Sequence, residues 1–342
     1  MKKTIFQLIK YVLLLGLVVF LLEVFIPRTY NVPPIHQRKG TQYWDLQTGS
    51  KIAYTLVAAK GIKKPYPIIF LQGGPGGFIS DRNIKMMEPL SEDGFDIYLY
   101  DQVGSGLSER LLDINEYTSE RHKKDLEEIT MKIGAKKVIF IGQSWGAILA
   151  TLFIADNPNK VEKVILTGAA PIQPMNEELV NIIIPDSLKL RKPIYSNAEA
   201  QEKTKNIRIN AASFCAKTFG KKLIPDQEAD AFQTYLNQEL NKVTVCDTSK
   251  ALKAEGGGGF YAQVMTVQSF KEIQDIRPKL KGSQIPILLM KGQCDNQAYG
   301  FLKEYLELFP NHQLKIIPDA GHSISVEQPE LYLKTIREFL NQ

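Results

Sequence analysis

The 342-residue sequence predicts an α/β fold with a mostly parallel central sheet, helices on both faces, an inserted helical cap and an apolar N-terminal helix. Continuous apolar runs separated by helical stretches are typical of a parallel sheet that is buried on both faces. Most of the runs precede Gly- or Asp-containing turns; they lie at 68–71, 97–100, 138–141, 164–166, 287–290 and 314–317. Hydrophobic residues make up 44% and charged residues 23%, which fits a globular protein.

The first 26 residues predict a membrane anchor. Lys2 and Lys3 precede a mostly apolar segment whose longest charge-free stretch, 11–22, lies between Lys10 and Glu23. A span needs about 20 apolar residues, so Lys10 and Glu23 would lie near the two membrane interfaces. A secretory signal peptide is the alternative, but no small-x-small cleavage site precedes Pro27.

The lysines on the N-terminal side favour a single-pass protein of the cell membrane, with a cytoplasmic N-terminus and an extracytoplasmic body. Three further positive residues on the other side of the span, Arg28, Arg38 and Lys39, weaken this asymmetry. The Pro-containing segment 27–40 predicts an extended linker that lifts the body off the membrane.

The body divides into a core at 41–170 and 276–342 and a cap at 171–275. Segments 42–46 and 51–58 predict a leading hairpin around the turn at 48–50. Within the cap, 226–240 has a helical pattern, whereas the four consecutive glycines 256–259 are incompatible with a regular helix or strand. These glycines indicate either a hinge, a close approach of backbone to a pocket, or a surface loop without a role.

Gly142-Gln143-Ser144-Trp145-Gly146 directly follows the apolar run 138–141 and precedes a helical run at 147–156. A G-x-S-x-G sequence between a strand and a helix predicts a nucleophile elbow, in which the serine occupies a strained turn. The helix N-terminus supplies N–H dipoles that favour developing negative charge. Ser144 is therefore the predicted nucleophile.

A serine hydroxyl is a weak nucleophile and needs a base beside it. Asp295 and His322 each follow an apolar run, so both are expected at the carboxyl edge of the sheet, where open α/β sheets place their sites. We interpret His322 as the base and Asp295 as its acid, with Asp319 as the alternative acid. The other histidines are His36 in the linker, His122 on an expected surface helix and His312 in a charged loop.

Acyl transfer also needs N–H donors for the oxyanion. The glycine-rich segment 71–77 follows an apolar run and can turn a backbone amide toward the pocket. We expect Gly74 and Trp145 to supply the two N–H groups; a plain flexible turn at 71–77 is the alternative.

These segments together resemble the ordered motifs of the proline iminopeptidase family of α/β-hydrolases. The motifs are Gln72-Gly73-Gly74-Pro75-Gly76, the segment Asp101-Gln102-Val103-Gly104-Ser105-Gly106-Leu107-Ser108, Gly142-Gln143-Ser144-Trp145-Gly146, Asp295 and Gly321-His322. The resemblance covers 41–342 and implies release of an N-terminal residue, often proline, from short peptides through an acyl-enzyme without metal or organic cofactor. It also implies the triad Ser144, Asp295 and His322, with Gly74 and Trp145 as oxyanion donors.

Two positions depart from the family pattern: Gln72 stands where His is usual and Val103 where Arg is usual. The family also uses cap carboxylates to hold the substrate's α-ammonium group, which needs a partner in a desolvated pocket. Glu255, beside the glycine run, is the candidate for this role, and a solvated surface glutamate is the alternative.

Charge and cysteine content argue against two further kinds of site, a nucleic-acid surface and a zinc centre. The net charge of +5 is spread along the chain, which argues against a nucleic-acid partner. Cys215, Cys246 and Cys294 lack a zinc-binding spacing; we expect isolated thiols, with a Cys215–Cys246 pair as the alternative and Cys294 buried next to Asp295. A small-ester hydrolase with the same triad and a non-catalytic binding protein remain alternatives, and the oligomeric state is left open.

Overall fold

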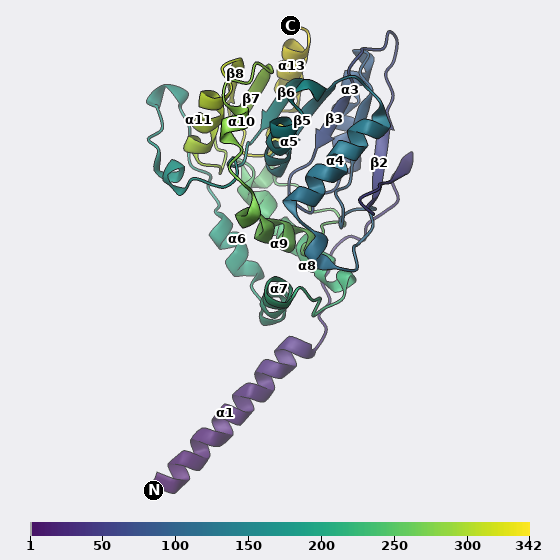
Figure 1. Cartoon of the computed structure of the whole chain (residues 1–342). Helices are drawn as coiled ribbons and strands as arrows, with labels where there is room; N and C mark the ends of the chain where they lie inside the picture. Colours follow the sequence, from purple (N-terminus) through teal and green to yellow (C-terminus); the bar gives the residue numbers. More distant parts are fainter. Residues whose placement is uncertain (1) are drawn as a thin grey trace.

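The computed structural model describes the backbone from residue 2 and the side chains from residue 5 to residue 342. Its body is built on an eight-stranded sheet in the order β1-β2-β4-β3-β5-β6-β7-β8, in which only the β1–β2 and β2–β4 pairs are antiparallel (Figure 1). This confirms the predicted fold class and the leading hairpin. The strands are β1 (Thr41–Asp45), β2 (Lys51–Val57), β3 (Ile68–Leu71), β4 (Ile97–Tyr100), β5 (Val138–Gln143), β6 (Val161–Thr167), β7 (Ile287–Gly292) and β8 (His312–Ile317).

Helices cover both faces of this sheet because successive strand residues point to opposite sides. Phe140 and its alternate neighbours pack with α4 and α5 on one face, whereas Ile139 and Ile141 pack with α2, α3 and α13 on the other. The helices are α1 (Lys2–Phe25), α2 (Asp81–Met87), α3 (Pro89–Glu92), α4 (Ser119–Ile133), α5 (Trp145–Asp156), α6 (Asn197–Thr204), α7 (Ile207–Phe219), α8 (Asp226–Val243), α9 (Phe260–Gln268), α10 (Arg277–Leu280), α11 (Tyr299–Leu308), α12 (Ile324–Glu327) and α13 (Pro329–Leu340).

The cap lies between β6 and β7 in sequence and contains α6 to α9, which gather at the end of the body nearer α1 (Figure 1). The glycine run packs closely on neighbouring backbone; the close approach is to other parts of the chain and not, as one of the three interpretations had it, to the pocket beside Ser144. A Cβ added at Gly259 would collide with the carbonyl oxygen of Gly104 in the core, and one at Gly256 would collide with that of Pro33. Side chains are excluded there because the cap backbone packs directly on neighbouring backbone.

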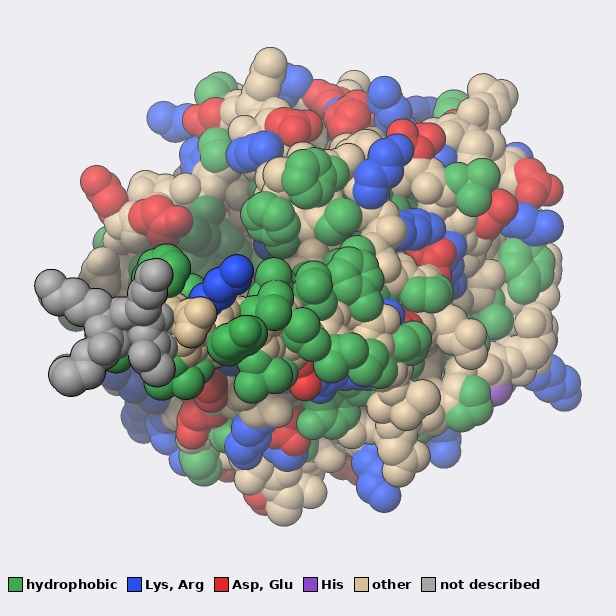
Figure 2. Space-filling view, turned by 90° about the horizontal axis from the view of Figure 1, so that it is seen from below, with side chains coloured by type: hydrophobic (Ala, Val, Ile, Leu, Met, Phe, Trp, Pro, Cys, Tyr) green, Lys and Arg blue, Asp and Glu red, His purple; other side chains and the backbone are tan. Residues whose placement is uncertain are grey.

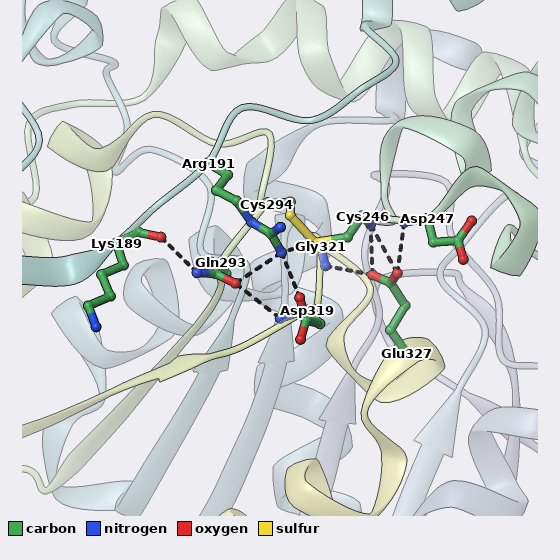
Figure 3. Close-up of a disulfide and its surroundings, with 9 residues drawn as sticks. All are labelled: Lys189, Arg191, Cys246, Asp247, Gln293, Cys294, Asp319, Gly321 and Glu327. Carbon is green, nitrogen blue, oxygen red and sulfur yellow. Dashed lines mark hydrogen bonds and ion pairs between the residues drawn. A yellow bond between two sulfur atoms is a disulfide. The ribbon is translucent and has the colours of Figure 1, made fainter. Parts of the chain in front are cut away.

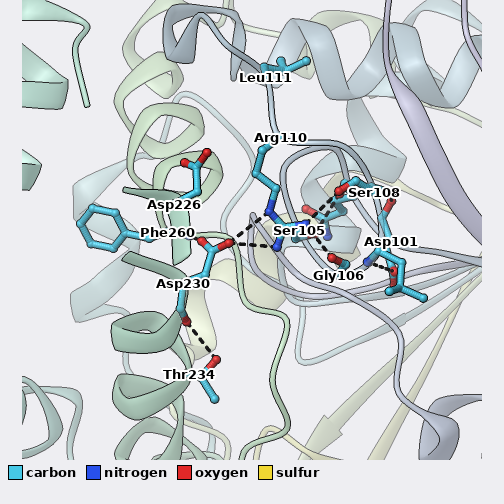
Figure 4. Close-up of polar contacts among 12 residues, drawn as sticks. Asp101, Ser105, Gly106, Ser108, Arg110, Leu111, Asp226, Asp230, Thr234 and Phe260 are labelled. Carbon is cyan, nitrogen blue, oxygen red and sulfur yellow. Dashed lines mark hydrogen bonds and ion pairs between the residues drawn. The ribbon is translucent and has the colours of Figure 1, made fainter. Parts of the chain in front are cut away.

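A half-buried polar contact also ties the cap to the core (Figure 4). Asp230 of α8 accepts hydrogen bonds from Arg110 Nη2 at 2.9 Å and from the Phe260 N–H, at the start of α9, at 3.0 Å. The same guanidinium donates to the carbonyl oxygen of Gly106 at 2.6 Å. Burial raises the pKa of Asp230, and the charge of Arg110 opposes that increase. One ion pair therefore joins two cap helices to the core loop at 104–110.

Helix α1 extends away from the body (Figure 1), and an 18-residue window within its residues 5–25 has a mean hydropathy of 2.5 and contains no buried residue. The segment 27–40 has no helix or regular strand, but it is not a free spacer. Arg38 is buried, and its Nη2 lies 2.7 Å from Asp101 Oδ2. Asp101 also accepts the backbone N–H groups of Ile79 and Leu107. The predicted linker therefore ends as a packed part of the body.

Candidate active site

Ser144 occupies the turn between β5 and α5, in a strained conformation with φ 53° and ψ −114°. Positive φ is uncommon for a residue with a side chain and often accompanies a functional site. A Cβ at Gly146 would collide with the carbonyl oxygen of Leu71, so the helix can approach β3 only with glycine at this position. The local sequence thus holds the serine at the sharp strand-to-helix turn that was predicted.

His322 and Asp295 are brought together at the carboxyl ends of β8 and β7. His322 Nδ1 lies 2.9 Å from Asp295 Oδ1, and both residues are buried. An Nδ1–H that donates to the carboxylate leaves Nε2 as the free acceptor, which is the arrangement a general base needs. The predicted pairing of acid and base is therefore present in the structure.

Lys291 is a buried partner of the same carboxylate, and the sequence interpretation missed it. Its Nζ lies 3.2 Å from Asp295 Oδ2 and 2.8 Å from the carbonyl oxygen of Gln297. Burial by itself would raise the pKa of Asp295, but the charges of Lys291 and His322, with hydrogen bonds from His322 and the Gln297 N–H, hold it well below its usual value. A lysine directly after the apolar run 287–290 was the available signal.

The serine and the histidine lie on either side of the end of β6. The Ser144 N–H donates to the carbonyl oxygen of Thr167 at 3.1 Å, and a Cβ added at the next residue, Gly168, would lie 2.6 Å from His322 Nδ1. No hydrogen bond joins the Ser144 hydroxyl to His322 among the described side chains. Such contacts are often long without substrate and tighten in the complex.

A cavity of about 340 Å³ opens beside Ser144. Both predicted oxyanion donors, Gly74 and Trp145, line it, and Trp145 opens α5, so its N–H has no partner within the helix. The lining is mostly apolar and contains no charged side chain; it consists of Gly74, Pro75, Ser144, Trp145, Ile148, Ala170, Pro171, Gln173, Met175, Val267, Phe270 and Gln297. The site therefore suits an uncharged group next to the serine.

Two other candidate residues lie away from this cavity. Glu255 is exposed and lines a separate small recess with His36 and Arg38, so it is not positioned to hold a substrate amine beside Ser144. Asp319, the alternative acid, is exposed and pairs with Arg191 at 2.7 Å instead of with His322.

His122 is buried in α4, so the expectation of a surface histidine was wrong. Its Nε2 lies 3.1 Å from Thr266 Oγ1 of α9, and its ring packs edge-on against Trp145. Burial, with a smaller effect of the Arg121 charge, lowers the pKa of His122 to about 3. His122 is therefore a neutral packing residue behind Trp145.

A disulfide joins Cys246 of the cap to Cys294, the residue before Asp295 (Figure 3). Both the expectation of isolated thiols and the alternative Cys215–Cys246 pair were therefore wrong. Cys215 is a free thiol. The expected burial of Cys294 is confirmed. Sequence could not reveal the partner, because the two cysteines come from different layers of the fold.

Glu327 reinforces this connection. Its buried carboxylate accepts the N–H groups of Cys246 at 2.9 Å, Asp247 at 3.1 Å and Gly321 at 2.7 Å (Figure 3). One side chain thus binds the cap segment after α8 and the loop that carries His322. Within the described residues, no group of three or more His, Cys, Asp or Glu side chains is placed to hold a metal ion.

A sequence profile described as the alpha/beta hydrolase fold matches residues 66–329. The chain belongs to the α/β-hydrolase family. Its relatives include a proline iminopeptidase of Heyndrickxia coagulans, 25% identical over 278 residues, which covers 80% of this chain and 90% of that protein. A proline iminopeptidase of Saccharolobus solfataricus is 22% identical and covers 86% of this chain and 90% of that protein. The resemblance to this family is thereby confirmed.

Solved structures agree on the α/β-hydrolase fold. An esterase from Exiguobacterium antarcticum has a TM-score of 0.60 at 18% identity, covering 88% of this chain and 99% of that one. A proline iminopeptidase from Mycobacterium smegmatis has a TM-score of 0.58 at 18% identity, covering 88% of this chain and 98% of that one. Because esterases and iminopeptidases superpose equally well on this hydrolase, the fold does not choose between them.

Proposed function

We propose that this α/β-hydrolase is a serine hydrolase that forms an acyl-enzyme on Ser144. The observation that carries the proposal is the buried, 2.9 Å contact between His322 and Asp295, next to a strained serine turn and an apolar cavity. Three groups of these types, in the chain order serine, aspartate, histidine, serve nucleophilic catalysis in this fold.

In the proposed mechanism, His322 Nε2 accepts the Ser144 proton as the hydroxyl attacks a carbonyl carbon of the substrate. Asp295, held ionised by Lys291, stabilises the imidazolium that forms. The Gly74 and Trp145 N–H groups bind the oxyanion. His322 then gives its proton to the leaving group, and water attacks the acyl-enzyme by the same route.

We further propose that the preferred substrate is a short peptide from which an N-terminal proline or similar residue is released. Support comes from the named proline iminopeptidases that align along most of this chain. A compact cavity with Trp145 and Phe270 stacked at 5.4 Å also suits a small apolar ring such as the side chain of proline.

A second function, hydrolysis of small esters, is favoured by one observation. No carboxylate is among the cavity-lining residues, and the polar side chains apart from Ser144 are Gln173 and Gln297. A substrate ammonium would therefore be desolvated beside neutral amides, which is costly, whereas an uncharged ester acyl group meets no such penalty.

We also propose that α1 anchors the protein in the cell membrane as a single span, with the N-terminus cytoplasmic and the catalytic body outside. A helix covering residues 5–25 is about 30 Å long at 1.5 Å per residue, which matches the hydrocarbon core. The lysines before the span support the orientation.

Turnover of three naphthylamides tests the function: those of proline, alanine and N-acetyl-proline, alongside a short acyl ester, using the full chain in detergent. Cleavage of only the free-amine amides would establish an aminopeptidase, and cleavage of the ester alone would establish the second function. Ser144→Ala should remove activity by at least about a thousandfold while leaving circular dichroism unchanged. Turnover that survives this substitution would refute the proposed nucleophile.

A further inference from the structure

Helix α7 of the cap has an exposed apolar face that nothing in the body covers. Phe214 and Phe219 are 61% and 63% exposed, and Ile207 is 43% exposed at the start of the helix. The opposite face is buried against the cap through Ile209 and Ala212. A soluble protein usually keeps large aromatic side chains of this kind out of water, so the exposed face indicates a contact.

The position of α7 is fixed relative to the end of α1. Arg208 Nη1 donates to the carbonyl oxygen of Val24 at 2.5 Å, and the same guanidinium makes a buried, bidentate ion pair with Glu228 of α8. Glu228 also accepts the N–H of Arg28 at 3.1 Å. The residue before α7, Asn206, donates to the Tyr30 hydroxyl at 2.8 Å. These contacts hold the first turn of α7 beside the last turn of α1.

This geometry sets the height of α7 above a bilayer. The apolar span ends at Phe25, one residue beyond the carbonyl that Arg208 binds. If α1 crosses the membrane, the first turn of α7 lies at the boundary between hydrocarbon and headgroups. Figure 2 shows the face from which α1 leaves: the apolar side chains of α1 lie across the middle of this view, and Lys and Arg side chains lie around them.

The charges around α7 fit an anionic surface. The helix contains no acidic residue, and exposed Lys217 and Lys221 flank Phe219. Apolar side chains combined with lysines are typical of a helix that lies in the plane of the interface, where the lysines reach the headgroups. A bilayer surface thus accounts for both the exposed aromatics and the basic rim.

We propose that α7 is a membrane-docking helix that inserts Phe214 and Phe219 into the leaflet from which α1 emerges. This proposal rests on the proposed membrane anchor. The helix adds a second membrane contact, and because α7 belongs to the cap, the cap becomes the membrane-facing side of the hydrolase. The apolar face is expected to enter the headgroup boundary by about 5–10 Å.

Tryptophan reporters in the full chain test this proposal in vesicles of phosphatidylcholine and phosphatidylglycerol. Phe214→Trp is the test variant, and Leu15→Trp reports on the middle of α1. Ile62→Trp is the matched control. Ile62 is an apolar residue that is 93% exposed, and it lies in the loop that precedes the amino end of β3, at the edge of the sheet opposite to the one that carries Ser144. Emission of the unmodified chain, which contains Trp44 and Trp145, is subtracted from each variant.

The expected result is a blue shift and quenching at position 214 by lipids brominated near the headgroup, stronger than by lipids brominated deep in the chain. Position 15 should show the reverse preference, and position 62 should show neither. Quenching at 15 with position 214 behaving like position 62 would overturn α7 docking while leaving the anchor intact. Absence of quenching at 15 would overturn the anchor and the docking together. A blue shift at 214 without lipid quenching would assign the face to a second copy of the chain and also overturn the proposal.

Discussion

Replacing Lys291 with methionine should weaken both the fold and the catalytic site. The ammonium group lies 3.2 Å from Asp295 Oδ2 and 2.8 Å from the carbonyl oxygen of Gln297, and it is almost fully buried. Methionine fills a similar volume but supplies neither the charge nor the hydrogen bonds. Asp295 would then keep only His322 and one backbone N–H to offset the cost of burying its charge.

The size of the effect follows from the pKa of Asp295. An opposite charge this close lowers an aspartate pKa by about 1–3 units, and each unit corresponds to about 1.4 kcal/mol. The variant should therefore lose about 1–4 kcal/mol of unfolding free energy at pH 7, toward the lower end because the buried ammonium's own desolvation cost disappears. Since the native pKa of Asp295 is depressed, this stabilisation is present above its unfolded value of about 4 and is lost as the pH falls through the native value.

Thermal and guanidinium unfolding at pH 7 and below pH 4, together with kcat/KM, would measure these effects. The difference from the unmodified chain should shrink in acid, and kcat/KM should fall about 10–100-fold because Asp295 and its loop lose a supporting contact. Lys163→Met is the control: Lys163 is half-buried in β6 and donates to the carbonyl oxygens of Phe339 and Leu340, away from the site. Unchanged kcat/KM with a stability loss independent of pH in Lys291→Met would refute the reasoning.

Two further substitutions test the connections between the layers of the fold. Cys246→Ser should reduce the free energy of unfolding by about 4 kcal/mol in non-reducing guanidinium titrations, because the disulfide closes a loop between residues 48 apart. Cys215→Ser removes only the free thiol, so it should leave the free energy of unfolding nearly unchanged. Equal losses in the two variants would contradict the Cys246–Cys294 disulfide. Arg38→Met should cost about 3–5 kcal/mol in the same titrations because it leaves Asp101 buried without its cation, whereas Arg82→Met, at an exposed position, should have little effect. Equal stability of the two variants would contradict a stabilising role for the Arg38–Asp101 pair.

The sheet and the position of the proposed catalytic residues were predictable because their signals are local. Each parallel strand contains a short apolar run, and Ser144, Asp295 and His322 each follow one, so the parallel topology brings them to one edge. The nucleophile elbow was readable for the same reason: its strand, serine and helix are adjacent in sequence.

Features that depend on partners distant in sequence could not be predicted in this way. The choice of Cys294 as partner of Cys246 depends on how the cap folds over β7, which leaves no local trace. The burial of His122 depends on α9, which packs against α4 from another part of the chain. Glu255 appeared suitable because it adjoins the glycine run, yet those glycines approach Pro33 and Gly104 instead of the cavity.

The cap is fixed at one end to the loops that carry Asp295 and His322. The carbonyl oxygen of Thr244 accepts the N–H of Ser323 at 2.8 Å, Glu327 binds the N–H groups of Cys246 and Gly321, and the disulfide attaches the same cap segment beside Asp295. A rigid-body opening of the whole cap would break all of these contacts at once, so it is an unfavourable route for substrate entry.

The cavity already reaches the surface without such a motion. Met175 and Val267 both line it and are 38% and 46% exposed, so they form its rim. Met175 lies in the stretch before α6, and Val267 lies near the end of α9. A substrate route beside these two side chains would leave the contacts made by the disulfide and Glu327 intact, so the proposed mechanism needs no movement of the loops that carry His322 and Asp295.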